Sequence, residues 1–277
     1  MKNYDAFLFA LHKMESQLKQ LTFYFHEGHD CMQLLQNKLD ELCAFINNEE
    51  HIREWHLWSH NEEIRTQAQL LRASSIEALC HVEKYQSRRL HRGESQISDY
   101  IRNLSHSVIN ELNLLQIDRQ SKVIFVGSGA LPTSSLIIAE HTGAEVLCLD
   151  IDLEAVELGR HTARLSGLGG KITFTNTSLL ELEFTRKATH VLIASLVSNK
   201  LELLEELKQV APKSVRIMMR YGNGLKSLFN CPLEDDFSEE WTQGKISNPS
   251  QIYDILLMER AKQMGMGSGF WLSMYHK

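Results

Sequence analysis

Apolar residues in the first part of the chain recur at the three- and four-residue spacing of amphipathic helices. Proline is absent before residue 118, and glycine occurs there only at Gly28 and Gly93. The clearest helical series are Leu8, Leu11, Leu18 and Leu21, then Leu34, Leu35, Leu39 and Leu42, and then Ile101, Leu104, Val108 and Leu112. We therefore predict an all-helical domain over residues 1–117, with roughly four to six helices and breaks near Gly28, Asn47–Asn48 and Gly93.

After residue 117 the pattern changes to short apolar runs that alternate with helical stretches. The predicted strands are Lys122–Val126, Glu145–Leu149, Lys171–Phe174, His190–Ala194 and Val215–Met219, and the predicted helices are Thr133–His141, Leu153–Leu165 and Lys200–Val210. This alternation indicates βαβ units on a parallel sheet, so residues 118–277 predict a Rossmann-like α/β domain. Near the end we expect a helix at Pro249–Met264 and a strand at Phe270–Met274, with an antiparallel hairpin closing the sheet.

The first predicted strand runs directly into Gly127, Ser128 and Gly129, and a helical pattern follows. Glycine lets the backbone turn tightly and approach a ligand, and the helix N-terminus adds partial positive charge. A dinucleotide site would need glycine or alanine three residues beyond Gly129, but Pro132 stands there and offers no amide to a pyrophosphate. A nucleotide without phosphates, such as S-adenosylmethionine (SAM), fits this loop better.

Polar residues follow the next two predicted strands. Asp150, Ile151 and Asp152 end the second strand, roughly 20 residues after the loop, where a carboxylate can accept hydrogen bonds from ribose hydroxyls. Thr177 and Ser178 follow the third strand, where such folds place polar groups against an adenine. The alternative is an ordinary turn with an acidic helix cap.

Composition and charge narrow the range of partners. The net charge is −6 with no long basic run, so nucleic acid is not expected as a partner. No apolar stretch approaches the roughly 20 residues that cross a bilayer, so no membrane partner is expected. The five cysteines form no C-x-x-C pair, which predicts reduced thiols in a cytoplasmic protein.

Two groups of histidines suggest a metal site but lack a complete ligand set in the sequence. His26, His29 and Asp30 lie close together, and His56 and His60 are four residues apart. A pair spaced by four on a helix can bind a metal, but no third ligand follows at a suitable spacing. We therefore expect no metal cofactor.

Several motifs closely resemble those of nicotianamine synthases. The first is the glycine motif from Phe125 to Ser135, and the others are Asp150–Asp152, Phe174–Thr177, Ala194–Val197 and Met219–Lys226. Lysine replaces the family's last arginine at Lys226. The match covers roughly residues 100–232, and the length of the chain resembles the bacterial branch that makes opine metallophores of the staphylopine, pseudopaline and yersinopine kind.

The resemblance implies an unusual use of SAM as co-substrate. Members of the family transfer its 3-amino-3-carboxypropyl (aminobutanoyl) arm to an amine and release methylthioadenosine. In the bacterial branch the acceptor is the α-amine of histidine, for which we expect the D-enantiomer although the sequence does not decide between the two. The product would pass to an opine dehydrogenase, and a homodimer is compatible with the family. The alternatives are a conventional small-molecule methyltransferase and an inactive SAM-binding regulatory module.

The resemblance also assigns roles to residues. Within the matched motifs we expect Ala194 and Leu196 to bind the nucleotide together with the glycine loop, and Arg220 and Tyr221 to bind the substrate, since an arginine can hold a carboxylate through two hydrogen bonds. For Arg220 the alternative is an ion pair at a strand end.

The acceptor amine must lose a proton before it attacks, which a carboxylate or phenolate can accept. In the family such groups come from the helical domain, and the resemblance points to Glu83 and Tyr100, with Glu77 on the same predicted helix as Glu83 a second candidate glutamate. Asp99 replaces the family's asparagine before the tyrosine. For each glutamate the alternative is a solvated surface residue.

Overall fold

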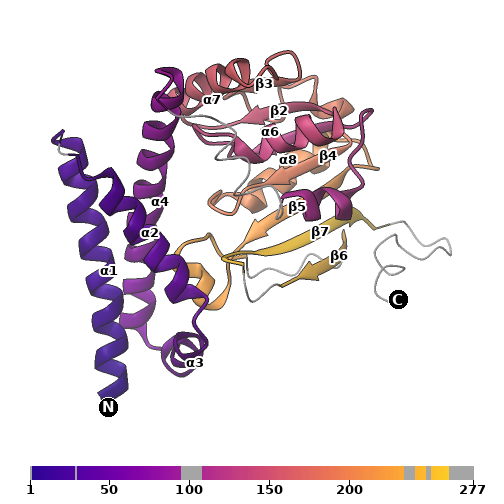
Figure 1. The fold of residues 1–277 in the computed structure, drawn as a ribbon. Coiled ribbons are helices and arrows are strands. Elements are labelled where there is room, and N and C mark those ends of the chain that lie inside the picture. The colour runs from indigo at the N-terminus through magenta and orange to yellow at the C-terminus, as the bar shows by residue number, and fades with distance from the viewer. Residues whose placement is uncertain (1, 29, 95–107, 234–240, 248–250, 262–277) are drawn as a thin grey trace. The chain divides into compact units, whose positions relative to one another are not determined.

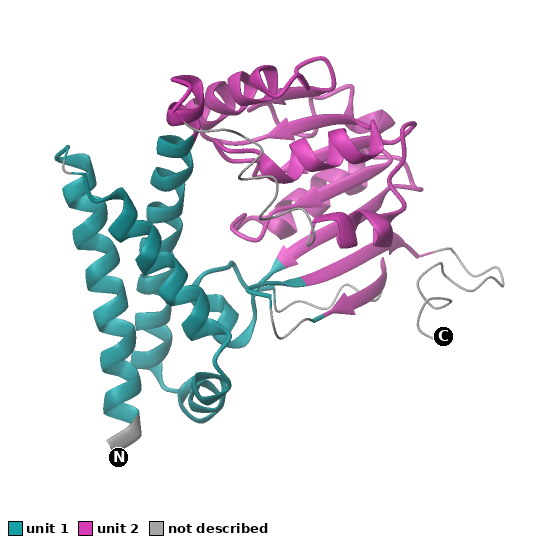
Figure 2. Ribbon diagram, viewed as in Figure 1, with its two compact units in different colours: residues 1–86, 221–233, 247–254 teal, residues 87–220, 234–246, 255–277 magenta. Residues whose placement is uncertain are grey.

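The computed structural model describes residues 2–28, 30–94, 108–233, 241–247 and 251–261 (Figure 1). The chain forms two compact units, each built from separate segments (Figure 2). The helical unit comprises residues 1–86, 221–233 and 247–254, and the sheet unit comprises residues 87–220, 234–246 and 255–277. Two short segments from the second half of the chain, residues 221–233 and 247–254, belong to the helical unit, so this division does not coincide with the expected single boundary at residue 117.

The described residues of the helical unit include four α-helices, whose ends fall near the expected breaks. These are α1 (Lys2–His26), α2 (Met32–Ile46), α3 (Glu49–Trp58) and α4 (Glu62–His91), whose last turn belongs to the sheet unit. Gly28 and Gly93 follow α1 and α4 with φ of 85° and 73°, a left-handed conformation that stops a helix. Asn48 caps α3 by accepting hydrogen bonds from the amides of Glu50 and His51.

The core of the helical unit includes a segment that is distant in sequence. The short helix η2 (Gly224–Leu228) contributes Leu225 and Leu228 to the apolar cluster of α1, α2 and α4. Arg72 of α4 donates a hydrogen bond of 3.0 Å to the carbonyl of Ser227, which ties the two segments together. Apolar spacing within the helices did not predict this partner.

The sheet unit is an α/β domain with seven strands in the order β3-β2-β1-β4-β5-β7-β6 (Figure 1). The strands are β1 (Lys122–Val126), β2 (Glu145–Leu149), β3 (Ile172–Thr175), β4 (His190–Ile193), β5 (Arg216–Tyr221), β6 (Trp241–Ile246) and β7 (Asp254–Arg260). The labelled helices are α6 (Thr133–Thr142), α7 (Leu153–Leu165), α8 (Lys200–Val210) and the short η1 (Thr185–Lys187). Residues 108–115, just before β1, are also helical. The first five strands are parallel, which confirms the Rossmann-like prediction.

The end of the described chain corrects one prediction. The helix expected at Pro249–Met264 is wrong, because residues 254–260 form β7. Its Ile-Leu-Leu-Met run is buried, and a short continuous apolar run does not distinguish a buried strand from a helix by its period. The expected antiparallel hairpin does close the sheet, but β6 and β7 form it. The strand expected at Phe270–Met274 lies outside the described residues.

The topology marks one position in the sheet. β1 lies between β2 and β4, so the chain proceeds outward from β1 in one direction and from β4 in the other. In open parallel sheets, ligands bind at the carboxyl ends of the strands where this reversal occurs. The residues after β1 and β4 therefore carry the candidate site.

Candidate functional site

The loop after β1 and the loop after β4 are packed against each other at the point of reversal. Gly127 and Gly129 have φ of 78° and 67°, a region that glycine enters without strain. A Cβ on Gly127 would lie 2.6 Å from Cγ2 of Val197 and 3.1 Å from Cβ of Ala194. The structure thus brings together two predicted site residues, Gly127 and Ala194, and leaves no room there for a larger side chain.

Asp150 holds the glycine loop through its carboxylate. Its Oδ2 accepts a hydrogen bond of 2.8 Å from the Gly129 amide, and its Oδ1 accepts one of 3.0 Å from the Asp152 amide. Asp152 caps α7 by accepting from the amides of Glu154 and Ala155. Ile151 is 92% exposed. Both predicted carboxylates therefore support backbone at the edge of the site, and their contact with a ribose stays a prediction.

The segment after β3 is a polar turn. The Thr177 amide donates to the hydroxyl of Thr175 over 3.1 Å, and the two threonine hydroxyls are 2.9 Å apart. The hydroxyl of Ser178 donates to Glu206 of α8 over 3.2 Å. Thr177 therefore lies in a turn closed by local hydrogen bonds, whereas Ser178 bonds to a helix.

Beneath the glycine loop lies a buried thiol that stays protonated. Burial raises the pKa of Cys148 to about 12, and the nearby hydroxyls of Ser135 and Ser128 act in the opposite direction. At neutral pH Cys148 is therefore a small apolar packing group. The side chain of Ser128 is buried as well.

A lysine that the sequence did not single out supports the loop after β4. Lys200 begins α8 and is only 2% exposed. Its ammonium donates hydrogen bonds to the carbonyls of Ser195, over 3.1 Å, and Val197. A cation in the first turn of a helix is electrostatically unfavourable, which is the signal that could have found it. Lys200 fixes the loop that packs on Gly127.

A glycine on α7 brings this helix close to the glycine loop. A Cβ on Gly159 would lie 2.7 Å from the Phe174 ring and 3.4 Å from the carbonyl of Gly129. The close approach of α7 thus depends on Gly159, another residue that the sequence did not single out.

Arg220 is paired within the sheet unit. Its guanidinium forms a two-pronged ion pair with Glu111, and its Nη1 donates to the hydroxyl of Ser134 over 3.2 Å. Arg220 is 8% exposed and Glu111 is almost fully buried, so removing either partner would leave a buried charge. Glu111 was missed because it lies 109 residues from Arg220. Substrate binding by Arg220 stays a prediction.

Four other predicted site residues lie outside the strand-end loops: Tyr221, Tyr100, Glu77 and Glu83. Tyr221 belongs to the helical unit, where burial and the nearby Asp254 raise its pKa. Tyr100 lies outside the described residues. Glu77 and Glu83 are six positions apart on α4 and therefore point roughly 120° apart around the helix. Glu77 lies beside His26 and His81, whereas Glu83 is partly buried.

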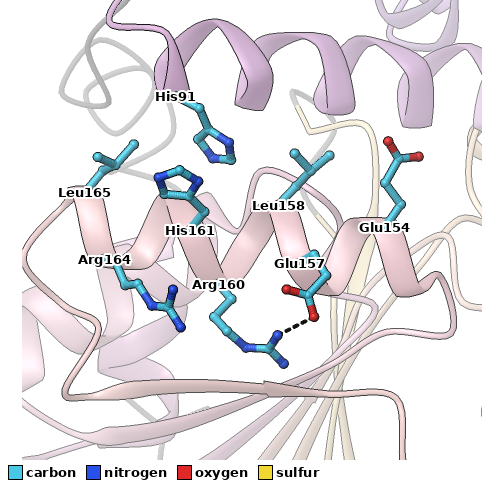
Figure 3. Close-up of a pocket in the computed structure, with 8 residues that line it drawn as sticks. All are labelled: His91, Glu154, Glu157, Leu158, Arg160, His161, Arg164 and Leu165. Carbon is cyan, nitrogen blue, oxygen red and sulfur yellow. Dashed lines mark hydrogen bonds and ion pairs between the residues drawn. The ribbon is translucent and has the colours of Figure 1, made fainter.

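The sheet unit also carries a shallow cavity of about 480 Å³ over α7, shown in Figure 3. His91 points toward His161 there, and the two rings are 3.9 Å apart. Burial lowers the pKa of His91, and the neighbouring His161 lowers it further. None of the predicted site residues lines this cavity.

Within the described part of the chain, no helix is long and apolar enough to span a membrane.

The fold and the strand-end loops define a Rossmann-like α/β protein, and comparisons identify its family. The model of the family described as nicotianamine synthase protein matches residues 94–262. The L-histidine 2-aminobutanoyltransferase of Pseudomonas aeruginosa (strain UCBPP-PA14) is 36% identical over 263 residues, covering 94% of this chain and 99% of its own. The enzyme of the same name from Yersinia pestis is 32% identical, covering 89% and 92%. The chain therefore belongs to the nicotianamine synthase family.

Solved structures support the fold. MtNAS in complex with MTA and tNA has a TM-score of 0.75 at 18% identity, covering 91% of this chain and 97% of that one. A glutamate-to-glutamine mutant of MtNAS in complex with S-adenosylmethionine has a TM-score of 0.70 at 17% identity, covering 90% and 98%. The shared architecture includes the N-terminal helices as well as the sheet.

Proposed function

We propose that this protein is a SAM-dependent histidine 2-aminobutanoyltransferase. It transfers the 3-amino-3-carboxypropyl group of SAM to the α-amine of histidine and releases methylthioadenosine. The observation that carries the proposal is the relationship to two enzymes named L-histidine 2-aminobutanoyltransferase over nearly the full length of each chain. The close-packed glycine loop at the strand reversal supports a nucleotide site there.

The reaction is a substitution at the γ-carbon of the methionine arm. The unprotonated amine attacks this carbon, a new C–N bond forms, and the C–S bond breaks with its electron pair remaining on sulfur. The positively charged sulfonium thereby becomes the neutral thioether of methylthioadenosine. Since all three carbons on the sulfonium are electrophilic, the site selects the arm by aligning one carbon at about 3–3.5 Å from the amine.

The two parts of the chain have different tasks in this proposal. Residues 118–277 hold the adenosine, with Gly127 and Gly129 approaching it through backbone and Asp150 or Asp152 receiving the ribose hydroxyls. Residues 1–117 supply the group that accepts the proton of the attacking amine. Glu83 is the first candidate for this base because it is partly buried on α4, whereas Glu77 is exposed. Tyr100 and Glu77 are the other candidates.

The acceptor in this proposal is L-histidine. The names of the relatives specify this enantiomer, which differs from the D-histidine expected from the sequence. The product carries a new carboxylate and a primary amine beside the imidazole, which makes it a metal chelator of the nicotianamine type. We place its synthesis in the cytoplasm and its consumption at an opine dehydrogenase. A homodimer is part of the same expectation.

The mass of the product tests this function. The full chain is incubated with SAM and either L-histidine or D-histidine, and all products are identified by mass spectrometry. We expect one aminobutanoyl addition to L-histidine, with methylthioadenosine in equal amount. Methylhistidine together with S-adenosylhomocysteine would replace the proposal by the methyltransferase alternative. Binding of SAM without turnover of either enantiomer would indicate a regulatory module.

A further inference from the structure

Three potential metal ligands meet in the helical unit. His26 is the last residue of α1, and Glu77 and His81 lie one turn apart on α4. One ligand atom from each lies within 4.8 Å of the other two. Glu77 and His81 have the i, i+4 spacing that places two side chains on one helix face. The sequence suggested no such set because His26 and His81 are 55 residues apart.

The two imidazoles already face each other. Their Nε2 atoms are 2.9 Å apart, and the rings are nearly perpendicular at 84°. One Nε2 must therefore carry the proton that the other accepts. On a tetrahedral zinc ion with bonds of about 2.0–2.1 Å, two nitrogens lie about 3.3 Å apart. To bind one ion, the two Nε2 atoms would have to move apart by a few tenths of an ångström, and the Glu77 oxygen, which lies within 4.8 Å of them, would have to take its place on the same ion.

We propose that His26, Glu77 and His81 bind a divalent ion of the zinc class. Two imidazole nitrogens and one carboxylate suit Zn²⁺, Co²⁺ or Ni²⁺, whereas Mg²⁺ and Ca²⁺ prefer oxygen ligands. Three protein ligands leave a fourth position on a tetrahedral ion for water or an external ligand. His26 and Glu77 are exposed and His81 is partly exposed, so the ion can reach the site from solvent.

Such an ion would connect the end of α1 to the middle of α4. The three ligands come together only when the helical unit is folded, so the ion binds the folded unit and not the unfolded chain. Metal binding therefore adds to the stability of the unit by mass action. Because Glu77 is also a candidate base for the proposed reaction, the site is tested by binding and stability and not by turnover. Its failure would therefore leave the proposed function untouched.

The chain offers a matched control in His56 and His60. These histidines are four residues apart and exposed, but within the described residues they belong to no group of three ligands. A double variant His56→Ala/His60→Ala removes as many imidazoles as His26→Ala/His81→Ala. Any loss that is specific to the second variant then reports on the three-ligand site and not on the number of histidines.

Calorimetry with Zn²⁺ on the full chain at about pH 7.5, where an ordinary imidazole is neutral, tests the proposal. We expect one ion per chain in the wild type and in His56→Ala/His60→Ala. We expect at least about tenfold weaker binding in His26→Ala/His81→Ala and in Glu77→Gln. Co²⁺ should give a visible absorption band and Zn²⁺ should raise Tm, both only where the three ligands are intact. Equal binding by the triad variants, or no binding by the wild type, would overturn the site. Circular dichroism verifies that each variant is folded.

Discussion

The two units of this protein carry their candidate functional residues in contrasting ways. In the sheet unit the backbone is fixed at each strand end, by the packing of Val197 on Gly127, by the carboxylate of Asp150 and by the buried Lys200. In the helical unit the described candidate bases are carboxylates on one long helix, α4. A loop shaped for a ligand can be recognised from its glycines, whereas a carboxylate on a helix resembles any surface glutamate.

The largest effect is expected in the helical unit. If Glu83 accepts the proton of the amine, Glu83→Gln should lower kcat roughly 10²–10⁴-fold and leave SAM affinity nearly unchanged. Steady-state kinetics and calorimetry with SAM measure the two quantities. Glu77→Gln is the matched variant on the same helix. Near-normal kcat in both variants would remove the carboxylates from the mechanism and leave Tyr100 or water as the base.

The second largest effect is a pH dependence of stability caused by His190, which begins β4 at the end of the sheet opposite the candidate site. Burial lowers the pKa of His190 to about 4 from its ordinary 6.5. Between pH 6.5 and pH 4, His190 takes up a proton in the unfolded chain but not in the folded chain. The contribution of His190 to the free energy of unfolding is therefore fully present above pH 6.5, and about 3 kcal/mol of it is lost as the pH falls to 4. His190→Asn should flatten this slope in urea unfolding, and the exposed His141→Asn should not. An unchanged slope in His190→Asn would contradict the assignment.

Gly127→Ala should affect the glycine loop directly. The new Cβ would meet Val197 in a left-handed conformation, which should cost about 1–3 kcal/mol of stability and weaken SAM binding roughly tenfold. Adding Val197→Ala removes the shorter of the two contacts but leaves the contact with Ala194 and the backbone strain, so the double variant isolates the effect of the Val197 contact. Unchanged SAM affinity in Gly127→Ala would show that this loop does not hold the nucleotide.

The smallest effect is expected for Lys200. Lys200→Met removes the donor from two carbonyls, at a cost of about 1–3 kcal/mol for unpaired buried groups. We expect a severalfold higher KM for SAM with kcat changed less, because the loop after β4 is loosened while the base is untouched. Lys200→Arg should recover part of the affinity. A fall in kcat alone, at constant KM, would contradict a role in holding this loop.

Much of the sheet unit could be predicted because its signals are local. The bounds of β1, β2, α7 and α8 agree with the predicted ones, since each apolar run ends at a turn residue. β7 was missed because its apolar run has no distinguishing period. The Arg220–Glu111 pair was missed because contacts between distant residues leave no periodic trace.

The helical unit was predictable as a set of helices but not as a set of contacts. Helices α1 and α4 end just before Gly28 and Gly93, and the left-handed conformation of these glycines is a local property that the sequence reveals. The packing of η2 into its core and the meeting of His26 with His81 depend on how distant segments fold together. The same reason prevents the sequence from ranking Glu77 and Glu83.

The fate of the SAM carbons tests the central claim most directly. The full chain is given L-histidine and SAM labelled either at the carboxyl carbon or at the methyl carbon, and the label is located by mass spectrometry. Our account predicts that the carboxyl label passes to the histidine product and that the methyl label stays in methylthioadenosine. A methyl label in the histidine product would contradict it.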